Sequence, residues 1–173
     1  EYAFKHPLTQ EVALGSQLRE RRARVHGAVA RALLEIHAEK PDPHAVLLAH
    51  HFEQAGDAAE AVHWHRRAAE WIGARDTRES LAHWRKVAEL LAGVPQTDET
   101  RSHRARAFGQ MVWSGTRSGL PESEIEPIFR EGLELARTSG NARAEALLLA
   151  GRAFIQGTDT RSQAREAFAV AER

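Results

Sequence analysis

Histidine is the residue type in this chain whose chemistry most readily supports a metal site, and ten histidines are present. Their spacing argues against a shared ion. On a helix the adjacent His50 and His51 point about 100° apart, and His63 and His65 point about 200° apart. Neither pair has the i,i+4 spacing that brings two imidazoles to one ion, and no His-Glu-x-x-His motif occurs. We therefore expect no metal ligands, although a helical metal-binding enzyme that uses the histidines stays an alternative.

Other catalytic chemistry has little support in the sequence. No Gly-x-x-x-x-Gly-Lys-Ser/Thr loop is present to bind phosphates, and no nucleophile elbow surrounds a serine. The chain has no cysteine, which excludes disulfides and thiolate metal sites and is typical of a reducing cytoplasm. We predict no catalytic residue, no cofactor and no enzymatic activity for this chain.

Three of the four tryptophans fall where helices are expected to pack against one another. Trp64 and Trp71 are seven residues apart and share one helical face, and Trp84 has a comparable place on the next helix. Alanines beside them let a neighbouring helix come close, so core packing is favoured over a platform on which a ligand stacks. Trp113 is flanked by glycines and can line a groove in the second half of the chain.

Arginines cluster at residues 19–24, where they could contact phosphates. However, Glu20 interrupts the run, and the 24 basic residues of the chain are balanced by 24 acidic ones. A solvated helix face, or pairing with another domain of the same protein, is therefore favoured over nucleic-acid binding. No apolar run approaches the roughly 20 residues that span a bilayer, and no signal-peptide pattern opens the chain. We expect a soluble, cytoplasmic protein with no nucleic-acid or membrane partner.

The segment 48–69 indicates how the chain folds. Small and aromatic residues recur at helical spacing on both sides of a Gly-Asp turn, as two closely packed antiparallel helices require. These residues are Ala49, Phe52, Gly56, Ala61, His65 and Ala68. Their order resembles the tetratricopeptide (TPR) repeat, a family of helical hairpins whose members usually bind partners.

Capping residues and helix breakers predict helices along most of the chain, after a short opening strand in which Tyr2, Phe4 and His6 alternate. Helices are expected at residues 7–14, 17–38, 42–55, 57–75, 77–91, 100–117 and 142–156, with two more opened by Ser123-x-x-Glu126 and Thr160-x-x-Gln163. The start and stop signals are Pro7, Gly15, Ser16, Asp42-Pro43, Gly56, Asp57 with Glu60, Thr77 and Gly93. Residues 93–99 are the most linker-like segment.

The second half of the chain repeats itself. A pair of glycines six residues apart occurs twice, offset by 42 residues, and each glycine-bearing helix is followed by a capped helix that carries a phenylalanine. The residues are Gly109, Gly115, Gly151, Gly157, Phe129 and Phe168. Two diverged helical hairpins account for this pattern, because each alone exposes an apolar face that stacking buries.

The first part of the chain also resembles a known junction. The matching residues are Phe4, His6, Leu8, Glu11, Val12, Leu18, Arg22, His26 and Ala30. They resemble the segment that joins the ATPase module to the TPR array in large bacterial STAND-type signalling ATPases, and the likeness covers about residues 2–92. In that family the output is often a class III adenylate/guanylate cyclase or a LuxR-type DNA-binding domain. No phosphate-binding loop or cyclase metal-binding carboxylate pattern is recognisable here, so neither activity is expected of this chain.

Together these features predict an all-α fold, a right-handed superhelix of TPR-like hairpins (an α-solenoid). Its parts are a junction at residues 1–40, which ends a winged-helix-like subdomain and adds a long linking helix, TPR-like hairpins at 41–95, and diverged, truncated hairpins at 96–173. We interpret the chain as an excised, non-catalytic interaction and regulatory module of a multidomain adenylate/guanylate cyclase. A LuxR-type transcriptional regulator is the alternative parent. The expected partner is a protein, a peptide or another domain of the parent chain.

Overall fold

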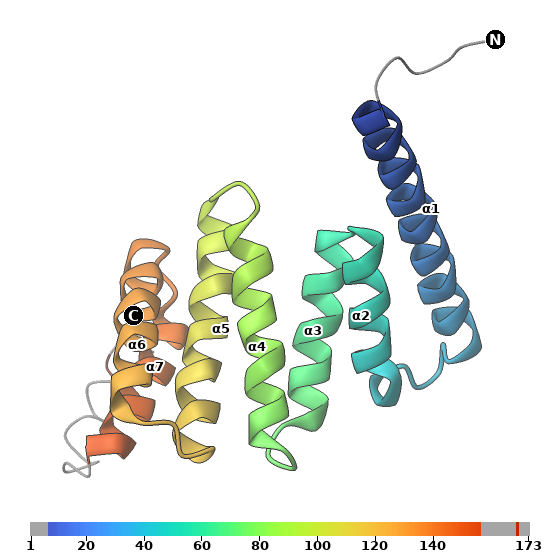
Figure 1. The fold of residues 1–173 in the computed structure, drawn as a ribbon. Helices are drawn as coiled ribbons and strands as arrows, with labels where there is room; N and C mark the ends of the chain where they lie inside the picture. Colours follow the sequence, from blue (N-terminus) through green and yellow to red (C-terminus); the bar gives the residue numbers. More distant parts are fainter. Residues whose placement is uncertain (1–6, 157–168, 170–173) are drawn as a thin grey trace. The chain divides into compact units, whose positions relative to one another are not determined.

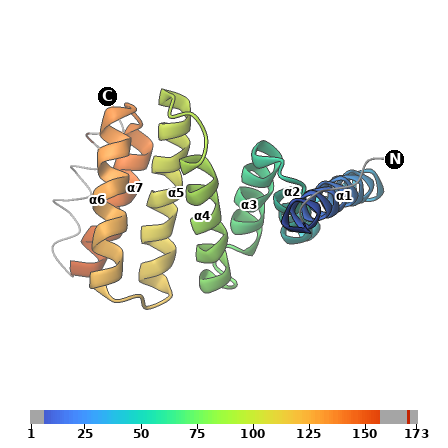
Figure 2. The same cartoon turned by 45° about the horizontal axis from the view of Figure 1, so that its top comes forward.

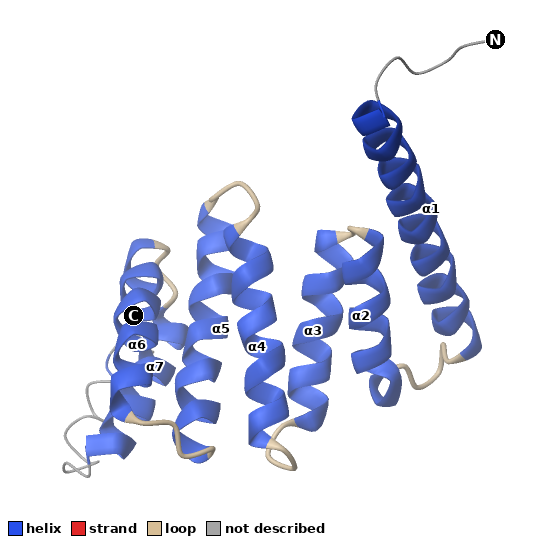
Figure 3. Ribbon diagram, viewed as in Figure 1, coloured by secondary structure: helices blue, strands red, loops and turns tan. Residues whose placement is uncertain are grey.

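The structure, a computed structural model, describes residues 7–156 and residue 169, and it builds them almost entirely from helices (Figures 1 and 3). The helices are α1 (Pro7–Ile36), the 3-10 helix η1 (Asp42–His44), α2 (Ala45–Ala55), α3 (Ala58–Ile72), α4 (Thr77–Ala92), α5 (Asp98–Arg117), α6 (Glu122–Thr138) and α7 (Ala142–Gln156). Since none of the described residues lies in a strand, the predicted all-α class is confirmed for them. The strand predicted at Tyr2, Phe4 and His6, the helix predicted from Thr160 through Gln163 to Phe168, and Gly157 lie outside the described residues.

The chain divides into two compact units. Unit 1 is Glu1–Trp64 and unit 2 is His65–Arg173, so the division falls inside α3. The domain boundaries near residues 40 and 95 stay predictions.

Unit 1 is organised around the contact between α1 and α2. Helix α1 runs unbroken through Gly15 and Ser16, so the predicted break between two helices there is wrong. A glycine inside a helix costs about 1 kcal/mol relative to alanine, and the helix-forming residues on both sides outweigh that cost. Further along α1, Gly27 faces Ala55 of α2: a Cβ atom at Gly27 would lie 3.6 Å from the Ala55 Cβ atom. The small side chains therefore let the two helices approach closely.

The turn between α2 and the first half of α3 follows the sequence prediction closely. Helix α2 ends at Ala55, and Gly56 adopts a left-handed φ of 74°. The Asp57 carboxylate then accepts a hydrogen bond of 3.2 Å from the Glu60 backbone N–H. Only half of the predicted capping box forms, because the Glu60 carboxylate instead accepts a hydrogen bond of 3.0 Å from the Trp64 indole N–H.

Several predicted helix ends differ from the structure. Residues Asp42, Pro43 and His44 form η1, so Asp42 does not cap α2 and the α-helix begins at Ala45. Helix α3 ends at Ile72, three residues before the predicted end, because Gly73 adopts a φ of 48° and reverses the chain.

Two predicted N-caps are also wrong. Asp76, and not Thr77, caps α4: its carboxylate accepts hydrogen bonds of 3.0 and 2.9 Å from the N–H groups of residues 78 and 79. Ser123 lies inside α6, because Pro121 precedes the helix in an extended conformation and the helix begins at Glu122. The Glu126 carboxylate is paired with Arg152 of α7 instead of completing a capping box.

Unit 2 packs α4 against α5, and both α6 and α7 against α5 (Figures 1 and 2). Of the segment 93–99, predicted as a linker, residues 93–97 form a tight connection between α4 and α5, and residues 98 and 99 already belong to α5. Within the connection the Gln96 amide donates hydrogen bonds of 2.9 Å to the Leu91 carbonyl oxygen and 2.7 Å to that of Val94.

The glycines of unit 2 mark the places where its helices come closest. A Cβ atom at Gly132 of α6 would lie 2.7 Å from the Phe108 Cβ atom of α5, and one at Gly151 of α7 would lie 2.7 Å from a Val112 methyl group of α5. A Cβ atom at Gly109 of α5 would lie 3.0 Å from the Leu147 side chain of α7. Two of the four glycines in the sequence pattern, Gly109 and Gly151, therefore lie at helix–helix contacts.

Candidate binding groove

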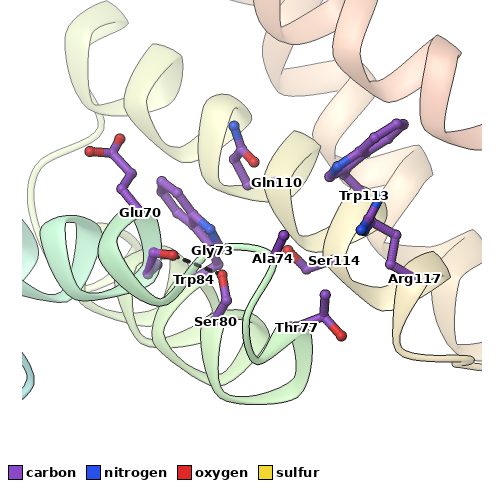
Figure 4. Close-up of a pocket in the computed structure, with 11 residues that line it drawn as sticks. Glu70, Gly73, Ala74, Thr77, Ser80, Trp84, Gln110, Trp113, Ser114 and Arg117 are labelled. Atoms are coloured by element: carbon purple, nitrogen blue, oxygen red, sulfur yellow. Dashed lines mark hydrogen bonds between the residues drawn. The ribbon is translucent and has the colours of Figure 1, made fainter.

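Unit 2 contains a cavity of about 300 Å³ between the end of α3, the start of α4 and one face of α5 (Figure 4). We call it the Trp113 groove. The residues that define its chemistry are Glu70, Thr77, Trp84, Gln110, Trp113 and Arg117. Helix α5 supplies three of them at i, i+3 and i+7, a spacing that places side chains on one helical face.

Two buried side chains, Trp84 and Ser80, form part of the lining of the groove. Trp84 of α4 is 2 % exposed and forms part of the wall. The Ser80 hydroxyl donates a hydrogen bond of 3.0 Å to the Ala69 carbonyl oxygen, which ties the start of α4 to the end of α3 (Figure 4). Gly73 makes the reversal between these two helices, so the groove wall depends on a residue that tolerates a left-handed φ.

The polar side chains of the groove differ in whether they have an ion-pair or hydrogen-bond partner. Glu70 is paired with Arg106 of α5, with 3.1 Å between the carboxylate and guanidinium atoms. The Arg117 guanidinium has no ion-pair partner, and the Gln110 amide no hydrogen-bond partner, among the residues that the structure describes. The groove therefore offers a cation and an amide to a ligand that carries a carboxylate or carbonyl oxygens.

An exposed aromatic surface lies beside these polar groups. Trp113 is 37 % exposed, and its ring centroid lies 6.2 Å from that of Phe154, a largely exposed side chain of α7. The expectation that Trp113 lines a groove of the second half agrees with this position. An indole next to a guanidinium can bury an apolar side chain of a ligand while the cation binds an oxygen.

The other tryptophans separate into two groups. Trp64 and Trp84 are buried in the helical core, as predicted. Trp71 is 43 % exposed, so the prediction of core packing is wrong for it. Because α3 ends one residue later, Trp71 lies in the last helical turn, where the Arg75 guanidinium covers its ring at 4.8 Å from the centroid.

The histidines meet in pairs that no spacing along one helix predicts. In unit 1 the Nδ1 atoms of His26 and His51 are 2.9 Å apart, and His50 contacts both rings edge-on. His37 and His44 stack with 3.6 Å between ring centroids. In unit 2 the Nδ1 atoms of His65 and His83 are 2.8 Å apart. Among the described residues, no group of three or more histidine, aspartate or glutamate side chains has an arrangement that could hold a metal ion.

Acidification is expected to destabilise unit 1. Burial, and then the nearby His26 and His50, lower the pKa of His51 in the folded state. A pKa that is lower when folded means that folding favours the neutral imidazole, so stability is lost as pH falls through the histidine range. The temperature of the thermal unfolding midpoint should therefore decrease when the pH is lowered from 7.5 to 5.5. Most carboxylates titrate below this pH range.

The source of this pH dependence can be tested with matched variants. His51→Gln removes the central ring and should flatten the dependence of the midpoint on pH. His103→Gln changes an exposed histidine on α5, beside Glu99, and should leave the dependence as it is. A midpoint that rises on acidification, or equal slopes in His51→Gln and the parent chain, would contradict the prediction.

Comparison with protein-family models, with curated proteins and with solved structures finds no match to this chain. None of the helices in the described part of the chain combines the length and the apolar character that a membrane span requires.

Proposed function

We propose that this chain is a non-catalytic interaction and regulatory module in which TPR-like helical hairpins present the Trp113 groove to a peptide segment of a partner. The observation that carries the proposal is the combination, in one cavity, of an exposed indole with a guanidinium and an amide that have no partner among the described residues. Tryptophan and arginine are the side chains that most often dominate binding energy at protein interfaces. Consecutive helices from α4 to α7 run antiparallel and pack together (Figure 1), which supports the repeat interpretation, since helical hairpins of this kind bury one another's apolar faces.

The parent protein that we propose is a multidomain adenylate/guanylate cyclase with a STAND-type ATPase module, and a LuxR-type regulator is the alternative. Both parents are supported by the resemblance of the first part of the chain to the segment that joins the ATPase module to the TPR array. Four of the residues that carry this resemblance have side chains that the structure describes, namely Leu18, Arg22, His26 and Ala30. The sequences that flank this segment distinguish the two parents. The remaining alternative, a metal-binding enzyme, predicts stoichiometric zinc or nickel in the purified, tag-free protein. That result would overturn the present proposal.

Selection of a displayed 12-residue peptide library on the full chain tests the groove. Enriched peptides should combine an apolar side chain with an acidic residue or a free carboxyl terminus, because both the indole and the guanidinium must be satisfied. Trp113→Ala and Arg117→Ala should each weaken their binding by about tenfold or more, measured by fluorescence anisotropy.

The chain contains a matched control for these two variants. Trp71 and Arg75 are another exposed tryptophan–arginine pair with i,i+4 spacing, and neither lines the groove. Trp71→Ala and Arg75→Ala should therefore leave binding within about twofold of the parent chain. Enriched peptides that respond equally to both pairs of variants, or a library from which nothing is enriched, would refute the assignment of the groove.

A further inference from the structure

Helix α1 exposes an apolar stripe next to the face that packs on α2. Leu18, Val25 and Ile36 are 65 %, 56 % and 72 % exposed, and Val29 is exposed as well. With Arg22 and Ala32, these residues alternate at spacings of four and three, the pattern of the contact seam in a two-helix coiled coil. We call these six positions the α1 stripe. Such a seam, continued over five helical turns, is suited to a partner that is itself a helix.

The positive charge of the residues that flank the α1 stripe favours a negatively charged partner helix. In a coiled coil the positions that flank the seam determine which helix pairs with it. Near the start of the stripe these positions are Arg19 and Arg21, and Arg22 lies on the seam itself. None of the arginines at residues 19–24 has an ion-pair partner among the residues that the structure describes, and Glu20 is the only acidic residue between residues 18 and 31.

The surface is also hollowed where the cations lie. A depression of about 390 Å³ is lined by Leu18, Arg21, Arg22, Val25 and His26. Aliphatic and basic side chains line this shallow depression together, so it can contact an aliphatic side chain that is followed by a carboxylate. We propose that the α1 stripe binds an acidic amphipathic helix, with the apolar seam of that helix on Leu18, Val25 and Val29 and its carboxylates on Arg19, Arg21 and Arg22.

The same charges disfavour the other occupants of such a face. A second copy of α1 in parallel register would place Arg22 against its own symmetry mate and would bring no carboxylate to Arg19 or Arg21. In antiparallel register a single carboxylate, that of Glu35, would face Arg21, and Arg19 and Arg22 would still have no acidic residue opposite them. An anionic membrane would satisfy the arginines, but a helix that lies in the membrane interface typically carries tryptophan, phenylalanine or leucine along its apolar face, and of these residue types the α1 stripe contains only Leu18. An acidic helix matches both the spacing of the apolar residues and the charge.

Binding of two synthetic helices to the full chain tests the proposal. Both peptides have three heptads with leucine on the seam, and the flanking positions carry glutamate in one peptide and lysine in the other. The glutamate peptide should bind, more weakly at 300 mM than at 50 mM salt, and the lysine peptide should bind at least tenfold more weakly. Val25→Ser should weaken binding of the glutamate peptide by about tenfold, since it removes an apolar contact from the middle of the seam.

A charge-matched pair of variants separates docking from general attraction. Arg21→Glu changes a residue beside the seam, whereas Arg24→Glu makes the same change in charge at an exposed position of α1 that lies well off it. Arg21→Glu should weaken binding of the glutamate peptide by tenfold or more, and Arg24→Glu by less than threefold. Trp113→Ala should leave this binding unchanged, because the Trp113 groove is a separate surface of unit 2.

Four results would overturn the proposal. The first is equal binding of the two peptides, and the second is equal loss in Arg21→Glu and Arg24→Glu. The third is a concentration-dependent dimer, detected by light scattering without peptide and abolished by Val25→Ser, which would identify a second copy as the occupant. The fourth is Val25-dependent binding to vesicles of equal phosphatidylserine and phosphatidylcholine without binding of the glutamate peptide, which would identify a membrane surface.

Discussion

Trp84→Ala is expected to lower the free energy of unfolding of unit 2 by about 3–5 kcal/mol, the usual cost of truncating a buried aromatic side chain. The Trp84 indole is 2 % exposed and lies in α4, the helix that packs against α5. Its removal costs the transfer free energy of the ring and leaves a cavity that the surrounding helices can close only in part. Denaturant unfolding of the chain, followed by helical circular dichroism, measures the change.

Trp71→Ala is the matched control for this prediction. Trp71 has the same side chain, but 43 % of it is exposed at the end of α3. Its loss should cost less than about 1 kcal/mol, because surface truncations remove little buried area. Equal losses of free energy in the two variants would contradict the difference in burial between Trp84 and Trp71. A Trp84→Ala loss below about 1 kcal/mol would mean that Trp84 does not lie in the core.

Gly132→Ala is expected to destabilise unit 2 by about 1–3 kcal/mol, although alanine is the better helix former. The added Cβ atom would lie 2.7 Å from the Phe108 Cβ atom and 3.0 Å from a Leu148 methyl group. A Cβ atom is fixed to its backbone, so α5 and α6 must move apart to relieve the contact with Phe108. The cost of separating them exceeds the gain in helix propensity of about 1 kcal/mol.

Gly27→Ala provides the opposite case in another helix interior. Its nearest neighbours would lie at 3.5 and 3.6 Å, which are ordinary van der Waals contacts. The substitution should therefore stabilise unit 1 by about 0.5–1 kcal/mol. Denaturant unfolding of both variants shows whether close helix packing or helix propensity dominates the effect of replacing glycine with alanine at each position. If Gly132→Ala were neutral or stabilising, helix propensity would dominate at this position and the close approach of α5 and α6 would be in doubt.

Features that depend on local backbone chemistry were predictable from the sequence. The end of α2 at Ala55 with a left-handed Gly56, the Asp57 cap and the start of α7 at Ala142 all follow from nearby residues. Errors arose where two local signals compete. Asp76 and Thr77 are both good caps, and the structure uses the first of them. Gly15 is a potential stop signal, but it lies inside a helix that its neighbours continue.

The candidate groove could be predicted only in part. The exposure of a glycine-flanked tryptophan at Trp113 has a sequence signal, and that residue does line the cavity. No sequence signal showed that Arg117 and Gln110 also line the groove, because this depends on which face of α5 is turned toward Gly73 and Thr77. That Arg117 has no ion-pair partner among the described residues is likewise a property of the surrounding helices, since another arginine of α5, Arg104, pairs with Glu131.

The histidines show most clearly where local information ends. Spacing along one helix showed that the His50 and His51 side chains point in different directions. It could not show that His26 of another helix places its Nδ1 atom 2.9 Å from the His51 Nδ1 atom. By itself the sequence determined that the part of the chain described by the structure is helical, where several of its turns lie, and which catalytic motifs the sequence lacks. The tertiary structure decided which histidines meet, which tryptophans are buried and which cations have no ion-pair partner among the described residues. Those outcomes depend on how helix faces are rotated and stacked, and the packing of the whole unit sets that rotation, whereas the periodicity of one segment does not.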